Sequence, residues 1–222
     1  LKTVLNNTHS LGVMIRKYNG KQDFKKVDEV VDRLLQAAES GTETVESFLS
    51  LSSTNVGLLS SDLSKIHVAE QIRAVLQKHQ FEDRVQVNFE KMQFNHLNMN
   101  AQLFESLIAN LVSNSIKYCD SEPLVSIQLL KLENRKIIRY QDNGVGIDLN
   151  KHREMMFKPF KRLLNKEGAR GSGVGLHLVQ RIVKASNGEI DVESSVGNGT
   201  LFILTFLDND QEKSPIEVKS LS

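Results

Sequence analysis

Two glycine-rich segments in the second half of the chain have residue types that could bind a polar ligand. Residues 142–147, with the sequence DNGVGI, directly follow a predicted strand. The Asp142 carboxylate can accept a hydrogen bond from an exocyclic amine, and Gly144 and Gly146 let the backbone approach a ligand closely. Residues 171–176, GSGVGL, open a predicted helix, where unpaired amides can cradle phosphate. Taken singly, a plain turn explains the first segment better than a binding site does, and a glycine-rich helix start is weak evidence for phosphate binding.

A long predicted helix carries a further group of polar residues. Asn110 and Asn114 are four positions apart, so their amides share one helix face, and Lys117 lies one turn further along. Amide oxygens suit Mg²⁺, a lysine suits phosphate, and Tyr118 could stack on a base. A solvent-facing polar stripe opposite the apolar face of the helix would have the same pattern.

A basic loop lies between residues 157–160, with the sequence FKPF, and Gly171. Such a loop could close over a polyphosphate, although an ordinary solvated loop could have the same composition. The adjacent glycine spacing does not match the dinucleotide fingerprint, and it lacks the Gly-Lys-Ser/Thr of a P-loop. The basic residues of the loop are Lys161, Arg162, Lys166 and Arg170.

Composition places these segments in an ordinary globular protein. The chain has 222 residues, 40% of them hydrophobic, and a net charge of +1, which favours neither nucleic acid nor an anionic membrane as a partner. The single cysteine, Cys119, excludes an internal disulfide framework and suits a reducing compartment. No apolar run approaches the roughly 20 residues that span a bilayer. Because the chain starts at Leu1 rather than Met, we expect a fragment. We expect this fragment to be cytoplasmic, in keeping with a reducing compartment, and to have no membrane contact of its own, whether or not its parent is anchored.

The N-terminal region, residues 1–56, is predicted to form two amphipathic helices joined by a turn near residues 19–23. Two such helices cannot bury both apolar stripes against each other alone. Pairing two hairpins into a four-helix bundle would bury them, so a homodimer is one solution. A hairpin packed on its own domain is the other. Residues 57–65 are predicted to be a linker.

Residues 66–208 alternate between helical and strand patterns. The predicted architecture is a two-layer α/β sandwich, with helices on one face of a mixed, largely antiparallel sheet. The polar residues 209–222 are expected to be a disordered tail. The predicted helices cover residues 67–79, 102–118 and 174–186, and the predicted strands lie at 85–89, 124–130, 136–141, 189–193 and 201–207.

Taken in order, these motifs resemble the ATPase domain of sensor histidine kinases. The polar helix, the DNGVGI segment, FKPF, GSGVGL and the GNGT sequence at residues 197–200 match its sequence boxes one by one. That domain belongs to a superfamily shared with gyrase-type topoisomerases, mismatch-repair ATPases and the ninety-kilodalton heat-shock chaperone. The resemblance covers roughly residues 65–207. It implies an α+β chain in which an N-terminal two-helix hairpin precedes an α/β sandwich of the GHKL (Bergerat) type.

The resemblance assigns a base-binding role to one group of residues. Asp142 would hold the adenine amine, with Gly144 and Gly146 making room for the base. Tyr118 would lie against the adenine, and Thr200 would support the pocket from its strand. The implied substrate is ATP.

The resemblance assigns phosphate and metal binding to a second group. Asn114, helped by Asn110, would coordinate Mg²⁺, while Lys117 and Arg162 would bind phosphates. The hinge and anchor of a lid over the phosphates would be three glycines, Gly171, Gly173 and Gly175.

The residue type at position 110, an asparagine, bears on whether the domain transfers a phosphoryl group or hydrolyses ATP. Hydrolases of this superfamily resemble one another in having a glutamate there, positioned to activate water. An amide cannot act as a general base, so this sequence favours transfer to a protein nucleophile. The Lys117-Tyr118 pair also resembles the kinase branch.

The expected nucleophile is His9, the histidine of the first predicted helix, which lies off the apolar stripe and should face solvent. The phosphoryl group would then pass to an aspartate of a response-regulator receiver domain. The residues after His9, SLGVMI, depart from the family pattern of an acidic residue, a basic residue, threonine or asparagine, and proline. Val13 cannot orient water, from which we predict loss of phosphatase activity.

Two alternatives remain open at the level of sequence. A degenerate module could bind ATP and dimerise without transferring a phosphoryl group, as the residues around His9 would allow. An ATP-hydrolysing machine of the same superfamily is disfavoured by Asn110.

Overall fold

The N-terminal region is a helical hairpin. A computed structural model describes residues 2–21, 23–35, 63–161 and 173–208 of the chain. Helix α1 (Lys2–Asn19) ends in a turn at residues 20–21, and residues 24–35 form the start of a second helix. Val30 on that second helix is buried, as its apolar stripe predicts. The predicted hairpin is therefore confirmed, although residues 36–56 lie outside the described part.

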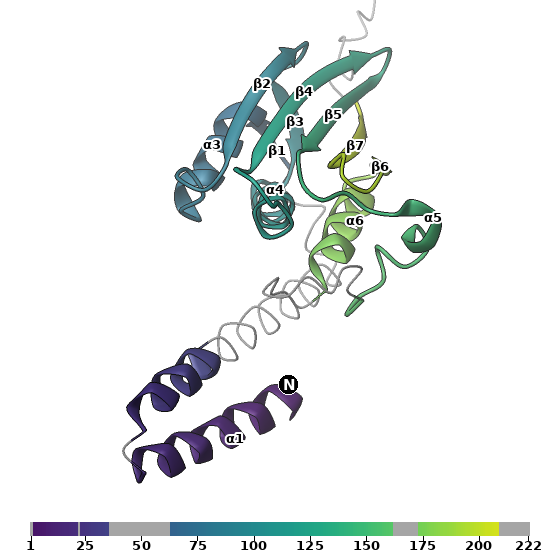
Figure 1. The fold of residues 1–222 in the computed structure, drawn as a ribbon. Coiled ribbons are helices and arrows are strands. Elements are labelled where there is room, and N and C mark those ends of the chain that lie inside the picture. The colour runs from purple at the N-terminus through teal and green to yellow at the C-terminus, as the bar shows by residue number, and fades with distance from the viewer. Residues whose placement is uncertain (1, 22, 36–62, 162–172, 209–222) are drawn as a thin grey trace, which may run out of the picture.

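The second region is built on a five-stranded sheet (Figure 1). Its strand order is β2-β4-β5-β7-β6, in which β2 runs parallel to β4 and every other pair is antiparallel. The predicted mixed, largely antiparallel sheet is thus confirmed. The strands are β2 (Gln86–Met92), β4 (Leu124–Leu132), β5 (Arg135–Asp142), β6 (Glu189–Ser194) and β7 (Thr200–Leu207).

Three helices cover one face of this sheet, which gives the two predicted layers (Figure 1). They are α3 (Val68–Lys78), α4 (Ala101–Lys117) and α6 (Gly175–Ala185). A four-residue helix, α5 (Leu149–His152), lies in the connection between β5 and α6.

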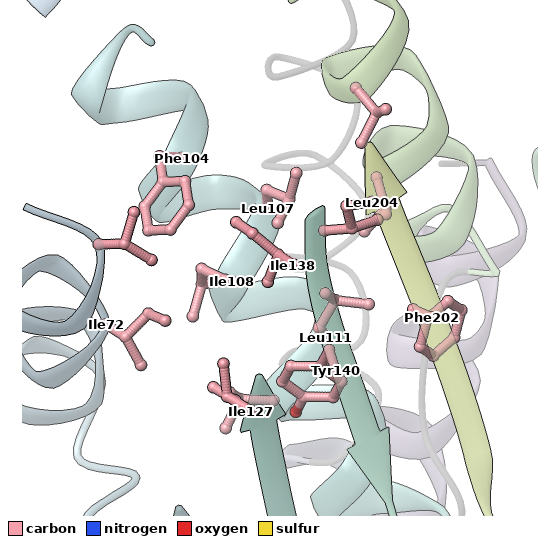
Figure 2. Close-up of a cluster of buried hydrophobic side chains, with 14 of the residues drawn as sticks. Ile72, Phe104, Leu107, Ile108, Leu111, Ile127, Ile138, Tyr140, Phe202 and Leu204 are labelled. Carbon is pink, nitrogen blue, oxygen red and sulfur yellow. The ribbon is translucent and has the colours of Figure 1, made fainter. Parts of the chain in front are cut away.

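The core lies between α4 and the central strands, as Figure 2 shows. Alternate residues of β5 face this core, among them Ile138 and Tyr140, both fully buried. Leu107 and Leu111, four positions apart on α4, meet them from the helix side. The residue that follows this buried series along β5 on the same face is Asp142, so core packing itself fixes where the carboxylate lies.

A two-stranded sheet differs from the predicted organisation. Strand β1 (Ser64–His67) pairs antiparallel with β3 (His96–Met99). Ser64 and Lys65 therefore belong to a strand, although their composition predicted the last part of a linker. Strands of four residues carry little periodic signal, and these two are formed by pairing Ile66 with Leu97, both buried, across the ladder.

Helix α4 begins at a well-defined cap. Asn100 is extended, and its side-chain oxygen accepts hydrogen bonds from the backbone amides of Gln102 (3.0 Å) and Leu103 (3.1 Å). This cap sets the start of the helix that carries the predicted polar residues. None of the helices in the described ranges is both long enough and apolar enough to cross a lipid bilayer. The predicted tail, residues 209–222, lies outside the description.

Candidate nucleotide-binding site

Asp142 is a buried carboxylate at the end of the central strand β5. It is 9% exposed, and its Oδ1 accepts hydrogen bonds from the backbone amides of Gly144 (2.9 Å) and Thr200 (3.0 Å). Burial raises the pKa of Asp142, while these two amides and a hydrogen bond from Ser115 act in the opposite direction. Both backbone donors bond to the same oxygen, Oδ1. A carboxylate has about four acceptor sites, so it can accept a further hydrogen bond, for example from the exocyclic amine of a ligand.

The glycines around Asp142 are required by close backbone contacts. A Cβ on Gly144 would lie 2.8 Å from the carbonyl oxygen of Tyr118. Gly146 has φ +70°, and a Cβ there would collide with the backbone oxygen of Ser195. Gly199, at φ +69°, would collide in the same way with the backbone oxygen of Asp142. The DNGVGI and GNGT sequences therefore pack against each other through their backbones, which only glycine allows.

Ser194 joins these loops through its hydroxyl group. Its Oγ accepts a hydrogen bond from the amide of Ile147 (2.8 Å) and donates one to the carbonyl of Gly199 (2.6 Å). The Oγ1 of Thr200 lies 3.1 Å from the same hydroxyl. Thr200 thus contributes twice, through its amide to Asp142 and through its side chain to Ser194.

The two asparagines of α4 face the start of α6. A Cβ on Gly175 would lie 2.9 Å from Asn110 Oδ1 and 3.7 Å from Asn114 Nδ2. Asn110 donates through Nδ2 to the carbonyl of Ser106 (2.7 Å), which leaves its oxygen directed at the helix start. Amide oxygens are suitable Mg²⁺ ligands. The oxygen of Asn110, joined by that of Asn114 when its amide group is flipped, would therefore suit a hydrated Mg²⁺ ion beside the first turn of α6.

The end of α4 connects the amide pair with the carboxylate. Tyr118 is the C-cap of α4, and its carbonyl accepts a hydrogen bond from the amide of Val145 (2.8 Å). Lys117, in the last helical turn, is half-buried. The structure thus brings Tyr118 beside the Asp142 loop, with Lys117 next to it in the chain.

The two ends of the predicted lid lie within the described residues, at Lys161 and Gly173. Gly173 has φ +70°, and a Cβ there would crowd the backbone of Lys161, so the two ends of the loop lie together. His177 Nδ1 lies 2.7 Å from the carbonyl oxygen of Phe157, so that nitrogen carries the proton and donates. This bond ties α6 to the FKPF sequence. Arg162 and Gly171 lie outside the described residues.

His9 is exposed on α1, as its position off the apolar stripe predicts. Val13 and Met14, one turn further along, are also exposed, at 55% and 45%. An exposed imidazole beside apolar side chains can be reached by another protein surface.

Several residues around the carboxylate were missed by the motifs. Ser115, Tyr140 and Ser194 contribute hydroxyl groups to the site, yet hydroxyl residues at these positions have no characteristic spacing. Only the closeness of these residues in the sequence to predicted site residues could have identified them. Tyr140 lies two residues before Asp142 on the strand, and Ser115 directly follows Asn114 on the helix.

The family described as "Histidine kinase-, DNA gyrase B-, and HSP90-like ATPase" matches residues 99–210 of the chain. A curated relative, the signal transduction histidine-protein kinase ArlS of Staphylococcus aureus (strain USA300), is 26% identical over 198 residues. That alignment covers 84% of this chain and 42% of the relative. The chain therefore spans less than half the length of the relative that it matches.

Solved structures show the same fold. The Acinetobacter baumannii histidine kinase AdeS aligns with a TM-score of 0.65 and 19% identity, covering 91% of this chain and 97% of that one. Histidine kinase ThkA, in complex with response regulator protein TrrA, aligns with a TM-score of 0.63 and 16% identity, covering 96% and 60%.

The buried aspartate, its glycine-rich loops and the sandwich fold define a nucleotide-binding domain of the GHKL type. The chain belongs to the histidine kinase-, DNA gyrase B- and HSP90-like ATPase family. The kinases among its relatives confirm the resemblance to sensor histidine kinases that its motifs indicated.

Proposed function

We propose that this chain is the kinase core of a two-component system, which transfers the γ-phosphoryl group of ATP to His9. The observation that carries the proposal is Asn110. It occupies the position where a hydrolase of this superfamily would have its water-activating glutamate, and its amide is already bonded to Ser106. The acidic residue Glu105, in the same helix, pairs instead with Lys78 (2.7 Å) and His79 (3.3 Å).

The transfer step requires a nucleophile, and exposed His9 would supply it. A ring nitrogen of His9 would attack the γ-phosphorus in line, forming an N–P bond as the bond to the β,γ-bridging oxygen breaks. ADP would leave with that electron pair, and the ring proton would pass to solvent. His9 would next yield the phosphoryl group to an aspartate carboxylate of a receiver domain.

The residues assigned to the site would divide the binding of ATP between them. Asp142 would accept the adenine amine, and Asn114 with Asn110 would hold Mg²⁺, which offsets negative charge on the transferred group. Lys117, together with Arg162 of the predicted lid, would bind the phosphates. Gly173 and Gly175 would shape the lid and the start of α6.

The hairpin supports the proposed assembly and partner. Val13, Met14, Phe24 and Leu35 are all exposed apolar side chains of the hairpin. Pairing of two hairpins into a four-helix bundle would cover such surface, so we propose a homodimer. The receiver domain would dock close to His9. The kinase core would work in the cytoplasm, where ATP is supplied.

The deciding experiment is incubation of the chain with γ-labelled ATP and Mg²⁺, in parallel with the His9→Ala variant. We expect acid-labile, alkali-stable label on the original chain and none on the variant. His79→Ala serves as a matched control, because His79 is half-exposed but lies at the end of α3. Label that persists in His9→Ala would contradict the assignment of the acceptor.

The residues around His9 favour one second candidate, an ATP-binding dimerisation module without phosphotransfer. Ser10 and Val13 stand where the family has an acidic residue and a water-orienting polar residue. This candidate predicts ATP binding without label on either protein. Steady ATP turnover without a phosphoprotein would instead indicate a hydrolase.

A further inference from the structure

Three polar side chains form a row across one end of the sheet. The strand order places β7 between β5 and β6. Ser194 of β6 is paired with Thr200 of β7 in the antiparallel register, so their side chains lie opposite each other on the same face. The β5–β7 register ends at Gln141 and Leu201, and one step further sets Asp142 opposite Thr200. The amide of Thr200 donates to Asp142 Oδ1 (3.0 Å), so these two residues are also neighbours.

The hydroxyl group of Ser194 has three partners within hydrogen-bond distance. The carbonyl oxygen of Gly199 lies 2.6 Å from Ser194 Oγ, and the amide nitrogen of Ile147 lies 2.8 Å from it. The third partner is Thr200 Oγ1, at 3.1 Å. A hydroxyl group has one proton and two lone pairs, so three partners use its full capacity.

The three hydrogen bonds can be formed together in only one way. A carbonyl oxygen can only accept, so the proton of Ser194 goes to Gly199. An amide can only donate, so Ile147 uses one lone pair of the hydroxyl oxygen. The second lone pair is left for Thr200, whose hydroxyl group must therefore donate to Ser194. Thr200 Oγ1 then has two lone pairs, and no proton, to offer a ligand.

We propose that Ser194 is a positioning residue that contributes to base selectivity, because it fixes Thr200 as a hydrogen-bond acceptor at the edge of the base. The inference deepens the proposed function and rests on it, since it concerns recognition of adenine beside Asp142. Thr200 Oγ1 would meet the base directly or through one bridging water. Ser194 acts through Thr200 and does not touch the base.

The direction of the Thr200 proton matters because adenine has an amine where the base of ITP has a carbonyl group. The Asp142 carboxylate and Thr200 Oγ1 are both acceptors, which suits the protons of an amine. Towards the carbonyl oxygen of ITP, both would present lone pairs and would stay unpaired. Without Ser194, the hydroxyl group of Thr200 can turn its proton towards such a carbonyl, so discrimination against ITP would weaken.

A purely structural role for Ser194 predicts a different result. Its hydroxyl group also joins the segments that contain Ile147 and Gly199, so its removal would lower stability under either role. If joining them were its only role, the affinities for ATP and ITP would fall together. The ratio of the two affinities therefore separates the two roles.

The experiment measures the affinities of the full chain and its variants for ATP and ITP by calorimetry near neutral pH. We expect Ser194→Ala to reduce the ATP-over-ITP affinity ratio about fivefold, the effect of about one hydrogen bond. Ser195→Ala is the matched control, because Ser195 is the next residue but is exposed, and its hydroxyl group accepts from Asn198 Nδ2 (2.9 Å) within the turn. It should leave the ratio unchanged.

A double-mutant cycle tests whether Ser194 acts through Thr200. Thr200→Val keeps the shape of the side chain and removes its hydroxyl group, so this variant should also have a lower ATP-over-ITP ratio. Adding Ser194→Ala to Thr200→Val should not change the ratio further, because the acceptor that Ser194 orients is already absent. Additive effects of the two substitutions on the ratio would contradict the inference.

The outcomes distinguish this inference from the proposed function. If the unaltered chain does not bind ATP, the proposed function fails and the inference fails with it. If the chain binds ATP but Ser194→Ala keeps the same ATP-over-ITP ratio, only the inference is overturned. Should Ser194→Ala not fold, Thr200→Val provides the test, and an unchanged ratio in that variant would overturn the inference.

Discussion

Two buried aspartates at opposite ends of the sheet have opposite surroundings. Asp142 ends β5 and is 9% exposed, while Asp208 follows the neighbouring antiparallel strand β7 and is 8% exposed. Asp208 forms ion pairs with Lys131 (2.6 Å) and Lys136 (3.0 Å), and its amide donates to the carbonyl of Asn134 (2.7 Å). Asp142 is surrounded by backbone amides and a hydroxyl group instead.

This difference in surroundings indicates that Asp208 is a structural carboxylate, whereas Asp142 is suited to binding a ligand. The charge of Asp208 is neutralised by lysines that belong to the protein, and it joins the β4–β5 hairpin to the end of β7. The charge of Asp142 is offset by hydrogen bonds but by no ion pair among the described residues, and burial raises its pKa. Perturbed carboxylates in this situation mark candidate functional sites.

The largest effect should follow from Asp142→Asn. The amide can keep its oxygen towards Gly144 and Thr200, but its NH₂ group would then face the adenine amine, donor against donor. We expect ATP affinity to fall by about a thousandfold, because a site built around a hydrogen bond rejects a mismatched partner strongly. Calorimetry with ATP tests this, and a thermal midpoint no lower than that of the unaltered chain would show that the fold is intact. A loss below tenfold would contradict the proposed role of Asp142.

Asp208→Asn should have the opposite effects to Asp142→Asn: a large loss of stability and almost no change in ATP affinity. It removes the carboxylate that faces the buried ammonium group of Lys136, so we expect the free energy of unfolding to fall by about 3 kcal/mol. ATP affinity should change less than twofold. Urea unfolding measures the first quantity. Lys131→Ala is the matched control and should cost under about 1 kcal/mol, since that side chain is 45% exposed. If Asp208→Asn weakened ATP binding as much as Asp142→Asn, the comparison would be wrong.

Gly146→Ala tests the backbone contact that holds the Asp142 loop. The new Cβ would collide with the carbonyl oxygen of Ser195 at φ +70°, so we expect a loss of about 2 kcal/mol of stability and weaker ATP binding. Gly197→Ala is the control, because Gly197 also has a positive φ (+85°) but nothing lies within 4 Å of its added Cβ. It should lose only about 1 kcal/mol, with ATP affinity retained. Equal losses in both variants would mean that strain alone matters.

The smallest effect concerns pH. Because the pKa of Asp142 is raised in the folded chain, the folded state holds this proton at higher pH than the unfolded state does. Its contribution to stability is present below the ordinary value of 3.8 and is lost as pH rises through the folded value. Asp142→Asn lacks this loss, so its stability relative to the unaltered chain should increase as pH rises from 3.8 towards neutrality. Urea unfolding at a series of pH values measures the difference, and a decrease over that range would contradict the raised pKa.

Much of the fold could be predicted where sequence periodicity was long. The predicted helix at 102–118 and strand at 136–141 agree with α4 and β5 to within one residue at each end. The four-residue strands β1 and β3 were not predicted, because each depends on the other for its hydrogen bonds. The parallel pairing of β2 with β4 was not predicted either, since pairing direction depends on how the intervening α4 crosses the sheet.

The candidate site was predictable where backbone shape demands a residue type. Gly146 and Gly199 need positive φ and have no room for a side chain, so their spacing is visible in the sequence. Asn110 and Asn114 share a face through helix geometry alone. Ser115 and Tyr140 were not predictable, because their contact joins positions 25 residues apart.

The sequence by itself determined the order of the motifs, the amphipathic elements that carry them and the amide at Asn110 that disfavours hydrolysis. These depend on residue type and local spacing, which the chain carries without folding. Only the tertiary structure decided which of two buried aspartates faces lysines and which faces hydroxyl and amide donors. The reason is that solvation and charge compensation depend on neighbours contributed by distant segments.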